Sequence, residues 1–382
     1  MPDVLVIGGG ITGVATAYEA ARAGATVTLL ERARLGAMAS GWTLGGVRQS
    51  GRDPAELPLA RDAVQRWATL SEELGTETGY RRGGNLRLAR TEAEVARIRR
   101  LVEEQRALGL DLSFLPDLGA VRQAAPSIGP GVLAASWCPT DGHADPPRAV
   151  QAYAAAARRL GAEIREGVTV HALTLTGRRV TGVETGDGPV AAGCVVLATG
   201  VHAPELLAPL GLRLPLSVRI VTVLQTAPVP PCLGPVFGVA NADCAGRQEL
   251  DGRLRVTTGV GTWPHDVAGW TEARLMPPAG ELAGLIGRVS AILPVLAETP
   301  VARIWGGLID LTPDALPVLD GPMDGLVVAA GFSGHGFGIG PVSGRLAAQL
   351  ALRQHPDHGL SPFRLDRFAR QAGTQAGLTL HG

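Results

Sequence analysis

The chain has 382 residues, which is long for one compact domain, so two domains with a shared core are the natural expectation. Hydrophobic residues make up 46% of the sequence, as is typical of a globular protein with a large core. The formal net charge is zero and no run of like charges occurs, which argues against nucleic acid or an anionic membrane as the main partner.

Three absences narrow the chemistry further. All 35 residues in the combined count of lysine and arginine are arginines, so no Schiff base or catalytic ammonium group can come from a lysine. No apolar run reaches the ~18 residues of a membrane-spanning helix, and no signal-peptide pattern occurs, so the cytoplasm is the expected compartment. The cysteines have no CxxC spacing, and we expect neither a disulfide framework nor a metal site among Cys138, Cys194, Cys232 and Cys244.

The first predicted elements form a βαβ unit. Residues 4–7 are a β-branched run typical of a buried parallel strand, residues 11–23 predict a closely packed helix, and residues 26–30 predict the next strand. Further along, the apolar spacing predicts helices over residues 61–74, 92–108 and 145–160, and strands over residues 84–89, 194–198, 214–224, 254–260 and 326–330. A glycine-rich loop and a last helix over residues 341–352 follow.

Buried strands of the parallel type therefore occur at the start, in the middle and near the end of the chain. Alternating strands and amphipathic helices fill the intervals between them. This order predicts an α/β protein with a discontinuous Rossmann-like nucleotide-binding domain and a second domain built on an antiparallel sheet. We expect the first domain to comprise residues 1–80, 145–210 and 306–382, and the second to comprise residues 81–144 and 211–305.

Residues 8–13 (GGGITG) match the GxGxxG fingerprint, and they follow a strand and open a helix, which is the context that gives the motif meaning. Gly8 permits the tight turn, Gly10 lets the backbone approach a pyrophosphate, and Gly13 lets the helix pack closely on the strand. Glu31 ends the second strand, where a carboxylate accepts hydrogen bonds from ribose hydroxyls. The motif serves both FAD and NAD; its position near residue 4 and the dispersed segments favour FAD, with an NAD-dependent dehydrogenase as the alternative.

Five further motifs carry a resemblance to a known family. The last third contains Trp305-Gly306-Gly307-Leu308, Thr312-Pro313-Asp314 and residues 331–337 (GFSGHGF), and earlier segments contain Ser40-Gly41 with residues 45–49 (GGVRQ), and Ala198-Thr199-Gly200. Together they resemble the D-amino acid oxidase superfamily, most closely its sarcosine oxidase and sarcosine oxidase β-subunit group. The resemblance implies a glutathione reductase-type FAD fold whose antiparallel sheet roofs the flavin. It is faint over residues 205–300, where the substrate is selected.

The fingerprint and the resemblance together imply an FAD site. The flavin is expected to be non-covalent, because the attachment cysteine of monomeric sarcosine oxidases aligns with Gly307, and residues 42–44 lack the histidine of the dimethylglycine dehydrogenase type. The expected cofactor-binding residues are Gly8, Gly10, Ile11, Thr12, Gly13, Glu31, Arg32, Ser40, Gly45, Gly46, Val168, Thr199, Gly200, Gly331, Gly334, His335, Gly336, Phe337 and Gly338.

The resemblance also implies the reaction, in which a hydride passes from the α-carbon of an amino acid or related amine to flavin N5, and the resulting imine hydrolyses. The catalytic candidates are Arg48, for the substrate carboxylate, and His335, which would orient or tune the flavin. The competing interpretations are that Arg48 binds an FAD phosphate or lies in a surface ion pair, and that His335 caps backbone groups. Ile309 stands where glycine oxidases and D-amino acid oxidases carry a carboxylate-binding arginine. Further candidates for the pocket are Arg219, Arg247, Trp263 and His265.

The absence of lysine favours a dehydrogenase over an oxidase. Monomeric sarcosine oxidases hold a lysine above the flavin, where a fixed cation stabilises the developing charge on oxygen. We therefore expect a quinone-like or dye-like carrier as electron acceptor, with O₂ as the alternative. Backbone N–H groups of residues 331–340, and the N-terminus of the helix expected near Pro341, would stabilise the negative charge of the reduced flavin. A second interpretation is a β-type flavoprotein subunit that is active only within a hetero-oligomeric amine or proline dehydrogenase complex. The sequence leaves both a hetero-oligomer and a homo-oligomer open.

Overall fold

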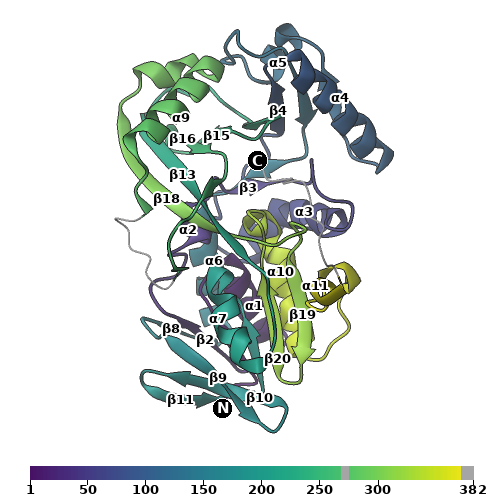
Figure 1. The fold of residues 1–382 in the computed structure, drawn as a ribbon, viewed down its shortest axis with the longest axis vertical. Coiled ribbons are helices and arrows are strands. Elements are labelled where there is room, and N and C mark those ends of the chain that lie inside the picture. The colour runs from purple at the N-terminus through teal and green to yellow at the C-terminus, as the bar shows by residue number, and fades with distance from the viewer. Residues whose placement is uncertain (268–274, 371–382) are drawn as a thin grey trace.

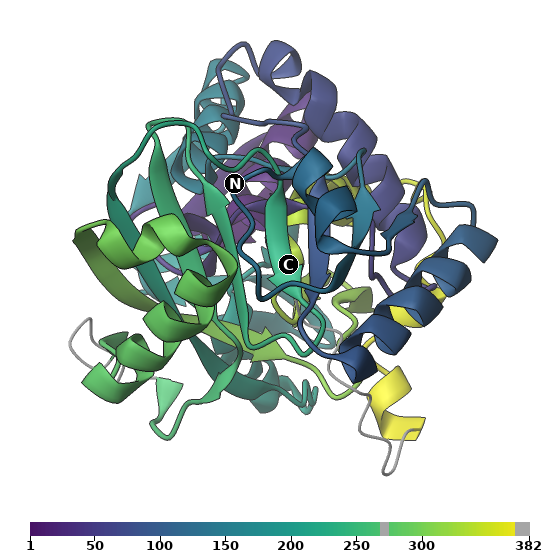
Figure 2. The same cartoon turned by 90° about the horizontal axis from the view of Figure 1, so that it is seen from above.

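Two large sheets organise the computed structural model, which describes residues 1–267 and 275–370. A six-stranded sheet lies in the lower half of Figure 1 and a nine-stranded sheet in the upper half, and long strand β13 reaches from one half toward the other. Seen from above in Figure 2, the strands of the upper sheet cross over the segments below them. The helices are α1 (Ile11–Arg22), α2 (Ala39–Trp42), α3 (Leu57–Glu73), α4 (Glu92–Ala107), α5 (Leu118–Ala124), α6 (Pro146–Arg159), α7 (Ala203–Leu207), α9 (Ala279–Ile292), α10 (Gly336–Ala351) and α11 (Arg367–Arg370).

The six-stranded sheet has the order β19-β20-β12-β1-β2-β8, and only its edge strand β19 runs antiparallel to its neighbour. Helices α1, α3, α6 and α10 pack on one face, and α7 and a small sheet pack on the other. Burial on both faces explains why the central strands are continuous apolar runs. The strands are β1 (Val4–Ile7), β2 (Val27–Glu31), β8 (Glu163–Glu166), β12 (Cys194–Leu197), β19 (Val318–Met323) and β20 (Leu326–Ala330).

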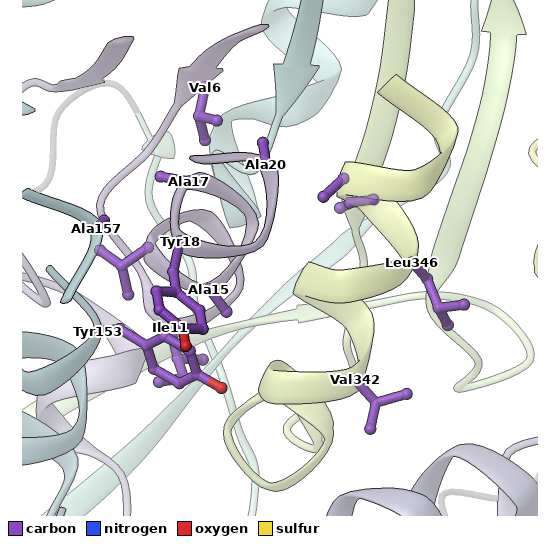
Figure 3. Packing of buried hydrophobic residues seen from close by; sticks show 14 of the residues in the cluster. Val6, Ile11, Ala15, Ala17, Tyr18, Ala20, Tyr153, Ala157, Val342 and Leu346 are labelled. Carbon is purple, nitrogen blue, oxygen red and sulfur yellow. The ribbon is translucent and has the colours of Figure 1, made fainter. Parts of the chain in front are cut away.

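Helices α1 and α10 pack closely enough that glycine is required between them. A Cβ atom on Gly344 would lie 2.4 Å from the Cβ atom of Ala15, and one on Gly340 would lie 2.7 Å from a side-chain carbon of Ile11. Figure 3 shows α1 beside the α10 ribbon, with Ala15 on the side of α1 toward α10, and Tyr18 next to the ring of Tyr153 from α6. The expected start of the last helix near Pro341 was wrong, because α10 begins at Gly336. Packing on α1 outweighs the low helix propensity of the glycines.

The nine-stranded sheet has the order β17-β13-β16-β15-β14-β4-β6-β5, with β18 paired to β13. Helices α5 and α9 cover its outer face, and the other face turns toward the six-stranded sheet. Its pairings are antiparallel except for β14 with β4. The strands are β4 (Asn85–Ala89), β5 (Ser113–Leu115), β6 (Ala134–Cys138), β13 (Ser217–Pro228), β14 (Val236–Val239), β15 (Cys244–Gln248), β16 (Arg253–Thr258), β17 (Gly261–Thr262) and β18 (Val301–Leu311).

The predicted fold class, a discontinuous nucleotide-binding sheet beside an antiparallel sheet, is confirmed. The boundary expected at residue 306 falls inside β18, which pairs with β13 along nearly its whole length. The expected segments 211–305 and 306–382 include residues 268–274 and 371–382, which lie outside the described part of the chain. Two small sheets were not predicted: β9 (Val170–Thr176) with β10 (Arg179–Thr185) and β11 (Gly188–Ala191), and β3 (Gly46–Val47) with β7 (Gly142–His143).

Within residues 1–267 and 275–370, none of the helices combines the length and the apolar composition that crossing a membrane requires.

Candidate active site

A cavity of about 490 Å³ lies between the two sheets. On one side, residues that end or follow the parallel strands line it, among them Ile7, Glu31, Ala198 and Ala329. On the other side the wall comes from strands β13, β15, β16 and β18 of the nine-stranded sheet. Nucleotides bind at the carboxyl ends of the strands in open α/β sheets, and this cavity lies at that edge.

The fingerprint glycines have three different surroundings. Gly8 has φ 106°, and a Cβ atom there would lie 2.4 Å from the carbonyl oxygen of Ala198. A Cβ atom on Gly13 would lie 1.9 Å from the carbonyl oxygen of Gly8, so helix α1 can approach the turn only because residue 13 is glycine. Gly10 is different, because a Cβ atom there would meet only the hydroxyl oxygen of Ser40, at 3.1 Å. Residue 10 therefore keeps space open on the side of the cavity.

Glu31 joins the turn after β1 to the turn after β2. Its Oε2 atom accepts a hydrogen bond from the backbone N–H of Gly9 at 2.6 Å, and its Oε1 atom accepts one from Ala33 at 2.8 Å. The backbone N–H of Val168 donates to the carbonyl oxygen of Glu31 at 2.9 Å, which brings a third segment to the same place. Each carboxylate oxygen keeps a lone pair that can accept a hydroxyl of a ribose.

The structure brings most of the expected cofactor residues to one cavity, and three of them lie behind its wall. Gly13 packs α1 on the turn, Gly45 (φ 72°) packs on Ala144, and the N–H of Gly331 donates to Asp310. The expected residues that line the cavity are Gly8, Gly10, Ile11, Thr12, Glu31, Arg32, Ser40, Gly46, Val168, Thr199, Gly200, Gly334, His335, Gly336, Phe337 and Gly338.

Arg48 lies in the cavity wall as part of a buried charged group. Arg48 and Arg52 are each 4% exposed, and the Nη1 atom of Arg48 donates to the carbonyl oxygen of Ser50 at 2.7 Å. A Cβ atom on Gly51 would lie 3.2 Å from Nη1 of Arg48 and 3.1 Å from Nη2 of Arg87, so the two guanidinium groups are close neighbours. We call Arg48, Arg52 and Arg87 the arginine cluster.

Two carboxylates accompany the arginine cluster. Glu56 Oε1 lies 3.9 Å from Nε of Arg52, and Asp141 accepts hydrogen bonds from the backbone N–H groups of Gln49 at 2.9 Å and Ser50 at 3.3 Å. Burial, together with repulsion from the other arginines of the cluster, lowers the pKa of Arg48 well below its usual range. An anion in the cavity would relieve this repulsion.

His335 and Glu56 form a buried pair beside the arginine cluster. The Nδ1 atom of His335 lies 3.1 Å from Oε2 of Glu56, and both side chains are almost completely buried. Burial, and then the charge of Arg52, lowers the pKa of His335 to about 4. Although burial acts to raise it, His335 and Arg52 lower the pKa of Glu56 to about 2. At neutral pH the ring is therefore neutral, donates from Nδ1 to an ionised Glu56, and keeps Nε2 as an acceptor.

The cavity wall on the nine-stranded sheet is mainly aliphatic. Val223 of β13 lies opposite Thr257 of β16, and Thr257 lies opposite Ala245 of β15. Because side chains alternate along strands, these three residues face the same side, as do Val221 and Ile309. All five line the cavity. We call these five residues the roof.

The register of the sheet leads from the roof to the arginine cluster. Ala245 lies opposite Gly238 of β14, and Gly238 is level with Arg87 of β4. Arg87 projects on the roof face of the sheet, next to Arg48. The cavity therefore has an aliphatic roof with cations at one end.

Several charged residues in or beside the cavity wall were not predicted from the sequence, namely Arg52, Glu56, Arg87, Asp141, Glu205 and Asp310. Arg52 and Glu56 follow Arg48 at spacings of four, but all three residues precede α3, so helical periodicity could not have predicted that they meet. Asp141 had no such signal, since it comes from a segment more than 90 residues away. Asp310 lines the cavity, and its Oδ2 atom accepts from the N–H of Gly331 at 2.8 Å. Burial raises the pKa of Asp310 to about 6, although the backbone N–H groups around it act in the opposite direction.

The four further candidates for the pocket lie outside the cavity wall. Arg219 donates to the hydroxyl of Thr262 at 3.2 Å, Arg247 is buried beside Glu249, and the ring of Trp263 meets the ring of His265 edge-on. Each of these contacts is a packing or ion-pair contact within the upper sheet or beside it.

The nucleotide-binding sheet, its glycine turn and the roofed cavity define a dinucleotide-dependent oxidoreductase. A family model described as "FAD dependent oxidoreductase" (DAO) matches residues 3–350. The chain belongs to this family, and the resemblance found in its motifs is confirmed.

Several curated proteins are similar over nearly the whole chain. The bifunctional protein ThiO/ThiG of Nostoc sp. is 31% identical over 99% of this chain, which spans only 57% of that relative's length. Glycine oxidase of Geobacillus kaustophilus is 30% identical over 98% of this chain and 99% of its own. Sarcosine oxidase subunit beta of Arthrobacter sp. is 29% identical over 96% of this chain and 91% of its own.

Solved structures agree with these relatives. The glycine oxidase from Geobacillus kaustophilus superimposes with a TM-score of 0.85 at 28% identity and covers 96% of this chain and 98% of its own. An L-proline dehydrogenase from P. horikoshii gives a TM-score of 0.88 at 28% identity, with the same coverage.

The residues present fit FAD. One cavity is lined by the glycine turn, by Glu31 and by the segments at residues 199–200 and 334–338. The Oγ1 atom of Thr199 and the Nε2 atom of His202 are buried in this wall without a hydrogen-bond partner, whereas Nδ1 of His202 lies 3.5 Å from Oε2 of Glu205. Buried polar atoms normally have a hydrogen-bond partner, so these atoms indicate that a polar ligand binds in the cavity.

Proposed function

We propose that this protein oxidises an amino acid or a related amine, with FAD as the hydride acceptor. The observation that carries the proposal is the cavity that joins an FAD fingerprint to the buried guanidinium groups of Arg48 and Arg52. Relatives named glycine oxidase, sarcosine oxidase subunit beta and D-amino acid dehydrogenase support the substrate class. We also propose that the six-stranded sheet marks the cofactor domain and the nine-stranded sheet, including β18, the substrate domain.

Arg48 and Arg52 would hold the substrate carboxylate. A guanidinium group binds a carboxylate through two parallel hydrogen bonds, which fixes the direction of the substrate as well as its position. The roof excludes water above the substrate, and this strengthens the attraction between the ions. Asp141 holds the loop that carries Arg48 through the backbone of residues 49 and 50.

The chemical change needs few protein groups. Bound FAD supplies the acceptor for the hydride that leaves the α-carbon. The amine must be neutral for its lone pair to assist this departure, and the imine product reacts with water to give a carbonyl compound and a free amine. Helix α10 begins at Gly336 in the cavity wall, so the positive end of its dipole favours negative charge at that place.

The test is an anaerobic screen in which the purified holoenzyme is mixed with D- and L-amino acids, N-methyl amino acids and prolines. Loss of flavin absorbance with one class of these compounds is the expected result. The proposal is wrong if none of them reduces the flavin while dithionite does.

We favour a dehydrogenase over an oxidase. The chain has no lysine to assist oxygen, and Arg48 and Arg52 are engaged by the substrate carboxylate in this proposal. Turnover with a dye acceptor should exceed turnover with O₂ by at least about tenfold, and the reverse order would show an oxidase.

A β-type subunit of a larger complex is the second candidate. Two relatives named sarcosine oxidase subunit beta each match 96% of this chain and 91% or 88% of their own length. Substrate-dependent dye reduction by the purified chain alone would exclude this role, whereas activity that appears only with a partner subunit would establish it.

A further inference from the structure

The cavity has two ends of opposite character. The arginine cluster occupies one end, and the roof covers the space beside it with the side chains of three branched aliphatic residues, one alanine and one threonine. The continuous register from Ala245 through Gly238 to Arg87 fixes these ends relative to each other. A substrate whose carboxylate lies at the arginine cluster must therefore place its side chain under the roof.

We infer that the substrate is an amino acid whose side chain is aliphatic or cyclic and uncharged, an inference that rests on the proposed function. Among the described residues of the upper sheet that line the cavity, Asp310 is the one with a charged side chain. Its carboxylate is occupied by the N–H of Gly331 on the cofactor side. The roof thus offers no counter-charge to a second carboxylate or to an amine at the end of a side chain.

The energetic difference is large enough to decide specificity. A charge moved from water into an aliphatic environment without a partner loses its hydration, and this penalty exceeds any gain from packing. An aliphatic side chain instead gains from burial, and each buried methylene raises affinity about fourfold. The roof should therefore discriminate most strongly between side chains of equal shape and different charge.

Matched substrate pairs test this directly. Leucine and aspartate have side chains of nearly the same shape, as do norleucine and ornithine, and each is tested in the enantiomer that the screen identifies. The measurement is the rate of anaerobic flavin reduction by the holoenzyme divided by the apparent Kd of the substrate. We expect leucine to exceed aspartate, and norleucine to exceed ornithine, by at least about 100-fold.

A charge placed in the roof should change this preference. Ile309→Arg introduces a guanidinium group into the roof, so the ratio of aspartate to leucine should rise at least about tenfold. Val301→Arg is the matched control, because Val301 is 46% exposed on the same strand and lies outside the cavity wall. The control should keep the wild-type ratio, and the flavin content of both variants is measured first.

The outcomes separate the inference from the proposed function. If aspartate or ornithine reduces the wild-type flavin as well as its apolar partner does, the inference is overturned and amino acid oxidation stands. An unchanged ratio in a flavin-loaded Ile309→Arg protein would also overturn it, because the roof would then not contact the side chain. If no amino acid reduces the flavin, the proposed function is overturned, and the inference with it.

Discussion

Arg48 is a cation that water hardly reaches, beside two more guanidinium groups. We predict that Arg48→Ala lowers kcat/KM for the best substrate by about ten- to several-hundred-fold, because charge-assisted hydrogen bonds contribute roughly 1.5–3 kcal/mol each. Flavin content should stay unchanged. Arg48→Lys should recover only part of the loss, because an ammonium group cannot reproduce the planar pair of donors. Steady-state kinetics on flavin-loaded protein measure the effect.

Two companion variants sharpen this prediction. Arg52→Ala should cause a loss of similar size, since Arg52 lies in the same wall and is equally buried. Arg219→Ala is the control, because Arg219 lies outside the cavity wall and should leave kcat/KM within about twofold. Near-normal activity of both cluster variants would show that another group holds the carboxylate. Loss of flavin from Arg48→Ala would place Arg48 in the cofactor site instead.

His335 links the site to acid stability. Its pKa is lowered from 6.5 to about 4 in the folded protein, so the unfolded chain binds the proton more tightly. The stabilising contribution is fully present above pH 6.5 and is lost as the pH falls toward 4. We predict that His335→Gln makes the free energy of unfolding fall less steeply between pH 6.5 and 4. The change in slope should correspond to at most about one bound proton. Urea titrations at several pH values measure it.

The exposed His355 provides the control for this experiment. His355→Gln should leave the slope between pH 6.5 and 4 as it is in the wild-type protein. If His335→Gln also leaves the slope unchanged, the ring is protonated in the folded protein, and the neutral state assigned to it above is wrong. Glu56 adds a second loss at lower pH, because its pKa of about 2 lies below the ordinary value of 4.5.

Among the site residues, those that belong to sequence motifs could be predicted, and those brought together only by tertiary contacts could not. Arg48 and His335 stood in recognisable segments, and both line the cavity. Asp141 could not be predicted, because its contact with residues 49 and 50 depends on how a distant turn is placed. Asp310 gave no signal either, since its partner Gly331 becomes a neighbour only when β18 passes the end of β20.

At the scale of elements, the turn from β1 to α1 contains glycines with separable roles. We predict that Gly10→Ala folds but loses at least tenfold in FAD affinity, because its Cβ atom meets only a hydroxyl at 3.1 Å yet fills space that a pyrophosphate needs. Gly13→Ala should instead lower the free energy of unfolding by about 3 kcal/mol or more, because its Cβ atom would lie 1.9 Å from a backbone oxygen. FAD titration and urea unfolding of the apoproteins distinguish the two effects.

A control with the same chemistry lies elsewhere in the chain. Gly234→Ala places its Cβ atom in open space outside the cavity wall and should change neither FAD affinity nor stability appreciably. If Gly10→Ala binds FAD like the wild-type protein, the pyrophosphate does not pass over this turn, and the role assigned to the fingerprint is wrong.

Elements with a clear period were predictable, and those decided by packing were not. Residues 145–160 contained a capping aspartate and two prolines, and α6 begins there as expected, with Asp145 accepting from the N–H of Arg148 at 3.0 Å. Helix α10 begins five residues before the expected place because α1 stabilises a glycine-rich first turn. Local propensity alone favours a loop there.

At the scale of the whole molecule, the cavity exists because the two sheets are held together around it. Arg255 of the upper sheet donates to the carbonyl oxygen of Thr43 at 2.8 Å, and Nε1 of Trp305 donates to the carbonyl oxygen of Trp42 at 3.2 Å. These bonds fix the roof to the loop after α2. The three separated segments of the lower sheet were predictable from their apolar runs, but the register across nine strands, which aligns the roof with Arg87, was not.

This arrangement leads to the last prediction, that FAD is bound without a covalent bond. Each cysteine lies outside the cavity wall, and Gly307, which we expect to align with the attachment cysteine of monomeric sarcosine oxidases, lines the cavity. Precipitation with acid should therefore release the yellow colour into the supernatant, because unfolding destroys the cavity that spans both sheets.

Stability provides an independent measurement of the same point. A ligand that binds only the folded state at 100 times its Kd adds about 2.7 kcal/mol to the free energy of unfolding, and this gain disappears on dilution. The Tm of the protein should therefore rise with added FAD and fall again after exhaustive dialysis against flavin-free buffer. A covalent flavin would give a Tm that does not depend on free FAD, and colour that stays with the acid pellet. Either result would contradict the prediction, and the attachment residue would then be sought among His171, His202 and His335, the histidines that line the cavity.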